Sequence, residues 1–353
     1  MLRRLISPLL ALLMLSLPLR AEVVAIYEAD APVLSEDARD RDQGIRSAFR
    51  RMLVKASGDV SIASAAEVEP LLSQLEQWTV SSEPRQQVVT NALGQPEVRN
   101  VLRVRFDPEA VRRVLTNLGR PIWPENRPAM MVWLVVDDGT RKQIASASQV
   151  QALGALTGRA EERGLIVQLP NMDSVDQGRV DPVTLWDAPL KTVVGASGRY
   201  GIQTSLLVRL RRTGEQWSAQ YALIQGSQYE EWSAVDASSG PLLSYGMDGA
   251  ADRLARRYAF DSSEPAMGLT SLWLTEVRSG ADYARALGYL RKLEVIRDLQ
   301  VLGADGDRAW LAMTVQAGPK RFKQLLKFDQ QLSLLELPVE AGKPALYALE
   351  LQH

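Results

Sequence analysis

Apolar and polar positions alternate along the chain in patterns that predict three consecutive folding units. In the first unit, residues 22–119, apolar side chains recur at helical spacing over 35–57, and Gly58 follows as a helix-ending residue. A capping box that begins at Ser64 and an N-cap at Asp107 predict two more helices. Strands are expected at 23–26, 88–89 and 98–106. Together these elements predict a small α+β domain with helices on one face of its sheet.

The last strand of this unit has two different faces. Leu102, Val104 and Phe106 alternate toward one side, which we expect to be the core. The other side carries three arginines, Arg99, Arg103 and Arg105. A basic face of this kind could dock an anionic polymer or an acidic partner, and the alternative is an exposed sheet face kept soluble by its charge.

A second unit is expected over residues 129–260, after a linker at 120–128 that contains three prolines and no periodicity. An apolar strand at 130–136, a helix at 144–163 and a strand at 165–169 predict a parallel pair with a right-handed crossover. An antiparallel meander and a last helix are then expected, at 205–212, 216–224, 229–235 and 242–258. The second unit is therefore predicted to be an α/β domain with a mixed sheet.

The third unit, residues 268–353, shows the element order β-α-β-β-α-β. Its strands are expected at 272–277, 295–302, 310–315 and 332–337, with helices that begin near Ser279 and Arg321. This order is typical of the ferredoxin-like fold. The whole chain is thus predicted to be a multidomain protein of the α+β and α/β classes.

Residues 1–21 have the pattern of a secretory signal peptide. Two arginines precede a mostly apolar run at 5–17, and the small residue Ala21 follows. The run is short for a membrane span, which needs about 20 residues. We expect cleavage near Ala21 and export to the periplasm, with an uncleaved N-terminal membrane anchor as the alternative. No later stretch is apolar enough to cross a bilayer, so no integral span is expected in the mature chain.

The composition limits the chemistry open to the protein. Its 353 residues, 46% apolar and 24% charged, are ordinary for a globular protein of several domains. The absence of cysteine excludes disulfides, thiolate metal sites and a lipid-anchored lipoprotein. The single histidine, His353, is the last residue, which is a poor place for a catalytic base or a metal ligand. Without residues 1–21, which hold three arginines and no acid, 38 basic and 42 acidic residues remain. This acidic balance argues against nucleic-acid binding.

Sequence motifs for catalysis and cofactor binding are missing. No phosphate-binding loop, dinucleotide fingerprint or nucleophile elbow occurs. Asp305 and Asp307 have the spacing of two calcium ligands, but Ala309 and Gln316 stand where further oxygen ligands are needed, so a hairpin turn is expected there. We predict no catalytic residue, no metal site and no cofactor.

Aromatic residues gather on the predicted meander. Trp217 and Tyr221 share a face by strand parity, and Trp232 lies on the next strand. An aromatic sheet face could bind sugar rings or a partner protein, because aromatic side chains supply much of the energy of interfaces. The alternative is core packing against a helix.

Asp137 and Asp138 follow the first strand of the second unit, at the end where α/β folds bind ligands. Adjacent residues on a strand point to opposite faces, so the two carboxylates are poorly placed to act on one atom. We regard them as candidates for a ligand crevice, and the Asp-Gly sequence favours a turn as the alternative.

A resemblance to a known family adds to this picture. The run from Ala48 to Gly58, Ala-Phe-Arg-Arg-Met-Leu-Val-Lys-Ala-Ser-Gly, with the charged residues 39–42 before it, resembles domain-of-unknown-function family 2066. The strand ends at 103–107 and 133–137 add to the resemblance, which extends over most of the mature chain. It implies an exported protein of a Gram-negative envelope, and it implies no activity, substrate or catalytic residue.

These observations lead to one functional hypothesis and two alternatives. The first is a non-enzymatic periplasmic protein that contacts an envelope protein or a cell-wall polymer. The second is a carboxylate-based hydrolase of glycans, with Asp137 or Asp138 in a cleft, because two acids can cleave a sugar bond without histidine. The third is a carrier of a small ligand, for which a largely apolar pocket is expected.

Overall fold

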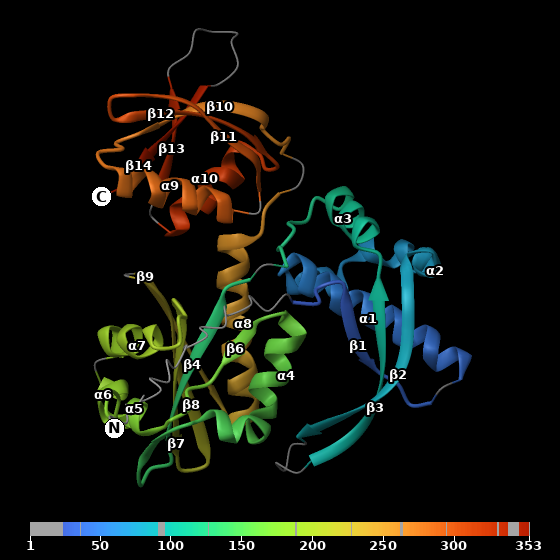
Figure 1. Ribbon diagram of the computed structural model, residues 1–353. Coiled ribbons are helices and arrows are strands. Elements are labelled where there is room, and N and C mark those ends of the chain that lie inside the picture. Colours follow the sequence, from blue (N-terminus) through green and yellow to red (C-terminus); the bar gives the residue numbers. More distant parts are fainter. Residues whose placement is uncertain are drawn as a thin grey trace, which may run out of the picture.

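A computed structural model describes residues 24–352, apart from 36, 91–95, 126, 188, 227, 262–263, 294, 330–331 and 338–345. The predicted signal peptide, residues 1–21, lies outside this part of the chain. The described residues form a mixed α+β protein with three sheets and ten α-helices (Figure 1). Each sheet is built from one consecutive stretch of the chain, and each has a hydrophobic core of its own.

The first sheet has three antiparallel strands in the order β1-β3-β2. Its elements are β1 (Glu28–Pro32), α1 (Ala38–Ser57), η1 (Val60–Ser64), η2 (Ala66–Gln74), α2 (Leu75–Trp78), β2 (Thr79–Thr90), β3 (Pro96–Phe106) and α3 (Pro108–Asn117). Helix α1 packs on one face of the sheet, where Phe49, Met52 and Leu53 are fully buried. The helices predicted at 35–57 and after Asp107 are confirmed as α1 and α3, and the strands expected at 88–89 and 98–106 fall in β2 and β3, which pair as a hairpin.

Three local predictions for this unit were wrong. The first strand begins at Glu28, because Ile26 donates its main-chain N–H to Val24 O in a turn before the sheet. The helix expected after Ser64 is mostly a 3₁₀ helix, η2, which contains Pro70 and has no side-chain cap. Proline lacks the N–H that an α-helix needs at that position. Strand β2 starts nine residues earlier than predicted, at Thr79, because an edge strand can be polar along much of its length.

The second sheet has the order β5-β4-β7-β8-β9, and β6 also pairs with β4. Its elements are β4 (Ala129–Asp137), β5 (Lys142–Ile144), η3 (Ala147–Leu153), α4 (Gly154–Arg163), β6 (Ile166–Gln168), α5 (Ser174–Gln177), α6 (Pro182–Asp187), α7 (Pro189–Gly198), β7 (Thr204–Thr213), β8 (Gln216–Gln225), β9 (Gln228–Asp236) and α8 (Ser239–Tyr258). Strand β4 is parallel to β6 and β7, and β7, β8 and β9 form the predicted meander. Helices α4 and α8 cover one face of the sheet, and α6 and α7 cover the other.

The helix predicted at 144–163 is shorter than expected. The chain turns back after β4 and pairs Lys142 to Ile144 with it as strand β5, and a 3₁₀ segment precedes α4. Helix α4 therefore begins only at Gly154. Local spacing could not reveal this, because β5 has only three residues and its identity depends on pairing with β4.

The third sheet has five strands in the order β11-β12-β10-β14-β13. Its elements are β10 (Gly268–Thr275), α9 (Gly280–Lys292), β11 (Ile296–Asp305), β12 (Arg308–Val315), α10 (Pro319–Asp329), β13 (Leu332–Leu337) and β14 (Leu346–Leu351). The predicted order β-α-β-β-α-β is present, and both helices cover the same face. The sequence prediction missed β14, which inserts between β10 and β13, runs parallel to β10, and moves β13 to the edge.

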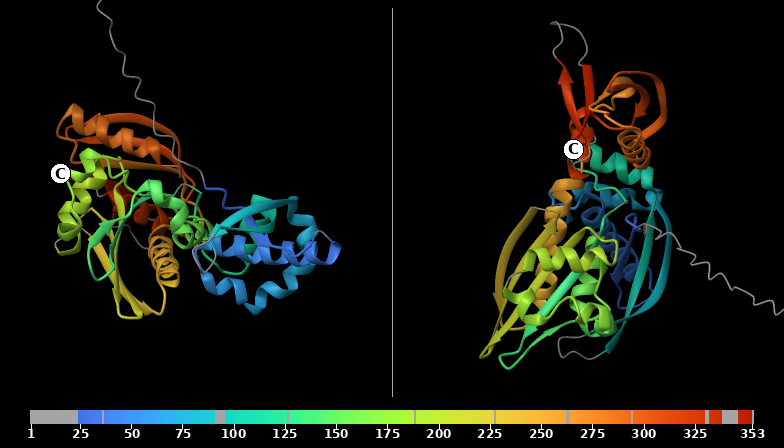
Figure 2. Two further views of the ribbon diagram at one scale, coloured as in Figure 1. Left: turned by 90° about the horizontal axis from the view of Figure 1, so that it is seen from below. Right: turned by 60° about the vertical axis from the view of Figure 1, so that its left-hand side comes forward.

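Contacts between the units are specific. In the linker, Ile122 pairs with Phe260, and Trp123 donates its main-chain N–H to Ala56 O over 2.7 Å. Helix α8 lies between the second sheet and the first unit, as the left view of Figure 2 shows. At its end, Arg321 of α10 donates to Tyr258 O and stacks on the ring of Phe260. The contacts of the linker hold the first two units together, and those of Arg321 join the third unit to the end of α8.

Candidate binding groove between the first two units

A groove with a volume of about 990 Å³ lies between the first sheet and helix α4. One wall is formed by the face of β1, β2 and β3 that points away from α1. The opposite wall is formed by α4, β6 and the first turns of α8. Each wall comes from a different unit, so the groove exists only because the two units are held together.

Strand parity decides which side chains of β3 enter the groove. Leu102, Val104 and Phe106 are buried beneath α1, as predicted. The residues between them point the other way, so Arg99, Val101 and Arg103 line the groove. The side chain of Arg105 is more than half exposed and is not part of this lining.

The three predicted arginines are paired with acids, which makes the face mixed in charge. Arg103 donates from Nε and Nη2 to the two carboxylate oxygens of Asp30, each over 2.7 Å. The Asp30 carboxylate raises the pKa of Arg103 above its usual value. Glu28 lies 3.5 Å from Arg105, and Glu97 lies 2.9 Å from Arg99. The basic face expected from the sequence is therefore largely neutralised by neighbours on β1 and β3.

The wall formed by α4 has small residues along its first turns, and charged residues, among them Arg159 and Glu162, line it further along. Gly154, Ala155 and Gly158 line it, and a Cβ atom added at Gly158 would meet no other atom within 4 Å. Tyr245, which is 49% exposed, rises from α8 at the side of the groove. Open space is therefore available along α4 for a bound chain.

Lys55, at the end of α1, contributes a buried cation to the lining. Its side chain is only 8% exposed, and its ammonium donates to Glu28 O over 2.9 Å. Burial lowers the pKa of Lys55, and Arg127 lowers it further, although Glu161 acts in the opposite direction. The amine thus ties α1 to β1 while it faces the groove.

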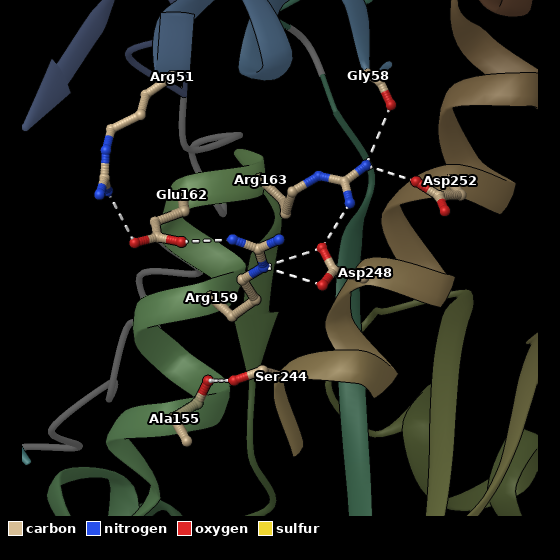
Figure 3. A network of polar contacts seen from close by, with 9 residues as sticks. All are labelled: Arg51, Gly58, Ala155, Arg159, Glu162, Arg163, Ser244, Asp248 and Asp252. Atoms are coloured by element: carbon tan, nitrogen blue, oxygen red, sulfur yellow. Dashed lines mark hydrogen bonds and ion pairs between the residues drawn. The ribbon is translucent and has the colours of Figure 1, made fainter. Parts of the chain in front are cut away.

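A network of polar contacts joins α1, α4 and α8 beside the groove (Figure 3). Arg163, with 1% of its side chain exposed, donates to the carboxylates of Asp248 and Asp252 over 2.6 Å each. Its Nη2 also donates to Gly58 O, over 3.1 Å. Arg159 donates from Nε to both oxygens of Asp248, over 2.9 and 3.0 Å. The network holds the end of α1 against the two helices of the second unit.

Arg127, in the linker, also joins the end of α1 to the end of α4. It donates to the main-chain oxygens of Lys55, Arg163 and Gly164, over 2.5, 3.0 and 2.9 Å. The guanidinium lies 3.7 Å from the centre of the Trp123 ring. Burial, and to a smaller extent Arg163, lower the pKa of Arg127 to about 9. Gly164 is required here, because its φ is +66° and a Cβ would lie 2.4 Å from Nη1 of Arg127.

No pattern in the sequence predicted that the cations Lys55, Arg127 and Arg163 would be part of a site. Lys55 and Arg163 fall in ordinary amphipathic helices, and Arg127 falls in a proline-rich linker. Their partners are mostly main-chain oxygens from distant segments. No spacing of residues along the chain predicts such contacts.

The predicted aromatic face lies in the core beneath α8. Tyr221 is 2% exposed, its hydroxyl donates to Leu242 O over 2.7 Å, and its ring stacks on Trp232 at 5.2 Å. Trp217 is partly buried and packs against the same core. This arrangement corresponds to the alternative of core packing that the sequence left open.

Asp137 and Asp138 lie in the turn between β4 and β5. Asp138 accepts hydrogen bonds from the main-chain N–H groups of Thr140 and Arg141 and from the Thr140 hydroxyl, which together lower its pKa to about 2. Asp137 lies 3.2 Å from Arg211 and 3.8 Å from Lys142. The strand end therefore continues into a hairpin, and each carboxylate is already engaged.

Within the described part of the chain, histidine, aspartate and glutamate form no cluster of three or more that could hold a metal ion. Among the described helices, none combines the length and apolar character needed to cross a membrane.

Comparison with known proteins identifies a domain of unknown function. Residues 21–124 match the family model of the domain of unknown function DUF8605. The match covers the first sheet with α1 to α3 and ends in the linker, and it does not single out family 2066. No curated protein matches the chain.

Solved structures share a weak likeness with parts of this chain. The C-terminal domain of LpoB from Salmonella enterica is 14% identical, over 31% of this chain and 80% of that chain, with a TM-score of 0.23. A competence-damaged protein (CinA) superfamily protein from Enterobacter cloacae is 11% identical, over 40% of this chain and 85% of that chain, also with a TM-score of 0.23. Likenesses with such low TM-scores carry no argument about function.

Proposed function

We propose that this protein is a non-enzymatic envelope protein whose groove, between the first sheet and α4, binds an extended segment of another envelope protein. The proposed location in the periplasm is supported by the signal-peptide pattern of residues 1–21. Membership of family 2066, and the division into domains at 22–119, 129–260 and 268–353, belong to the same proposal.

The observation that carries this proposal is the lining of the groove. Acidic and basic side chains occur together on its walls, several of them in pairs such as Arg103 with Asp30 and Arg51 with Glu162. A carrier of a small metabolite is expected to have a mostly apolar pocket with a few polar groups. A mixed-charge wall facing small residues suits a peptide chain better, because its main-chain and charged groups can replace some of these pairings.

A protein segment is also favoured over a glycan. Binding of sugar rings relies on exposed aromatic faces, and among the described residues that line this groove Tyr245 is the one with an aromatic side chain. The predicted sugar-binding aromatics, Tyr221 and Trp232, pack against α8 instead. The alternative of a carboxylate-based hydrolase lacks support, because its candidate residues Asp137 and Asp138 are engaged in a hairpin turn.

Site-specific photo-crosslinking in cells tests the proposal. A benzophenone side chain placed at Tyr245, in the groove, is compared with one placed at Tyr229 on β9, because the two tyrosines are 49% and 50% exposed. We expect one discrete protein adduct from position 245 and none of the same mass from position 229.

A blocking variant shows whether the adduct depends on the groove. Gly158→Phe places a ring into the open space along α4, and Gly195→Phe is the matched control on α7, where a Cβ also meets nothing within 4 Å. The adduct should disappear with Gly158→Phe and persist with Gly195→Phe. Adducts that survive the blocking variant, or that arise equally from both tyrosine positions, would contradict the proposal.

A further inference from the structure

A second cavity, of about 260 Å³, lies where the β4–β5 turn meets the end of β7. It shares no lining residue with the groove. Of the seven described residues that line it, four are cationic, and Asp137 is the one acid among them. The lining therefore carries a formal excess of three positive charges, in a protein whose net charge is −1.

The single acid of this cavity is already neutralised. The carboxylate of Asp137 accepts from Arg211 Nε at 3.2 Å and lies 3.8 Å from Lys142 Nζ. Its Oδ1 also accepts the main-chain N–H of Gly139, over 3.1 Å. Asp137 thus orients two of the cations and leaves little of its own charge to repel an anion.

The other two cations make no close ion pair with a described carboxylate, although the charge of Arg141 acts on nearby Asp138. Arg141 and Arg212 form no ion pair with any residue in the described part of the chain. Arg212 donates to Gly214 O, and the side-chain oxygen of Gln143 accepts from Arg141. Asp138 is close in sequence, but its carboxylate accepts from Thr140 and Arg141 N–H groups within the turn. These two guanidinium groups keep donors for a ligand.

The aromatic ring of Trp186, on α6, contacts two of the cations. Arg211 lies 4.8 Å and Lys142 5.5 Å from the centre of this ring. Contact with a ring face holds the two side chains in place. Arg211 and Lys142 are therefore arranged before any ligand arrives, which lowers the entropy cost of binding.

We propose that this cavity binds a phosphate group. Arginine forks match the oxygens of phosphate and donate two parallel hydrogen bonds to them, and a doubly charged anion gains most from several cations around one small space. The phosphate group can belong to a soluble or polymer-borne phosphate, or to the headgroup of an anionic lipid. This function goes beyond the proposed groove and does not depend on it.

Titration calorimetry with inorganic pyrophosphate, at low ionic strength, provides the first test. We expect saturable binding that weakens as salt is added, because added ions screen the attraction. The double variant Arg141→Ala/Arg212→Ala should bind at least about tenfold more weakly, since each loses a charge-assisted hydrogen bond. The control is Arg278→Ala/Arg308→Ala, two exposed arginines of the third unit, which should bind like the parent protein.

Cosedimentation with lipid vesicles separates the two sources of phosphate. Binding to phosphatidylglycerol vesicles, absent with phosphatidylcholine alone and lost in Arg141→Ala/Arg212→Ala, would assign the site to a lipid headgroup. Pyrophosphate binding without vesicle binding would assign it to a soluble or polymer-borne phosphate. If neither ligand binds, or if the control variant weakens binding as much as the cavity variant, the proposal is overturned.

Discussion

Arg163 on α4 donates from Nη2 to the main-chain oxygen of Gly58, the residue that ends α1, over 3.1 Å. The two residues are 105 positions apart and belong to different units. The same guanidinium holds Asp248 and Asp252 of α8, so one buried side chain connects three helices at the side of the groove. The relative position of the groove walls thus depends on this arginine.

Removal of Arg163 should destabilise the protein. Arg163→Met leaves the Asp252 carboxylate and the Gly58 oxygen without this donor, and it leaves Asp248 with Arg159 alone. We expect a loss of about 2–3 kcal/mol, because both carboxylates are partly exposed and regain water. Urea unfolding measures the change. Arg51→Met, which removes an exposed pair with Glu162, should cost no more than about 1 kcal/mol. Equal losses for the two variants would show that Arg163 does not organise the junction.

Gly58 is expected to tolerate no side chain. Its φ of +76° is strained for other residues, and a Cβ would lie 2.3 Å from Cβ of Ala255 on α8. Gly214 has a similar φ of +61° with open space around it, so Gly214→Ala measures the backbone strain alone. We expect Gly58→Ala to lower the melting temperature more than Gly214→Ala does. The difference reports the contact between the first unit and α8, and a zero difference would argue against that contact.

Helix α8 needs glycine where it meets the stacked aromatic rings. A Cβ at Gly246 would lie 2.6 Å from Tyr221, and one at Gly249 would lie 2.5 Å from Nε1 of Trp232. Gly249→Ala should therefore cost about 1–3 kcal/mol through overpacking. Gly195→Ala, at an open position in α7, should be neutral or stabilising by up to about 1 kcal/mol. Chemical denaturation compares the two, and a stabilising Gly249→Ala would contradict the close packing.

Asp138 should stabilise the β4–β5 turn in a pH-dependent way. Its pKa is about 2 in the folded protein, below the value of about 3.9 for a free side chain. The contribution is therefore complete above about pH 4 and is lost as the pH falls toward 2. The difference in stability between the parent protein and Asp138→Ala should shrink over that window.

NMR titration of the Asp138 carboxyl checks the cause of this shift. Thr140→Val removes the hydroxyl hydrogen bond of 2.6 Å and keeps the main-chain bonds of the turn. The pKa of Asp138 should rise in this variant and remain below that of a free aspartate. An unchanged value would mean that the hydroxyl contributes nothing.

The local pattern of apolar and polar residues was enough to predict much of the secondary structure. The alternation of Leu102, Val104 and Phe106 with arginines identified the two faces of β3, and Asp107 and Gly58 marked helix ends through their own backbone chemistry. Such signals act within a few residues, which is why a single sequence carries them. Local pattern did not predict strand β14, because its place beside β10 depends on a partner about 75 residues away.

The sequence by itself determined the mixed α+β class, the absence of cysteine chemistry, and which face of each regular element is apolar. The tertiary structure alone decided what lies opposite those faces. It paired Arg103 with Asp30, covered Tyr221 and Trp232 with α8, and brought Lys55, Arg127 and Arg163 into one junction. Periodicity records which side of an element avoids water, but ion pairs and grooves arise between elements whose distance along the chain carries no pattern.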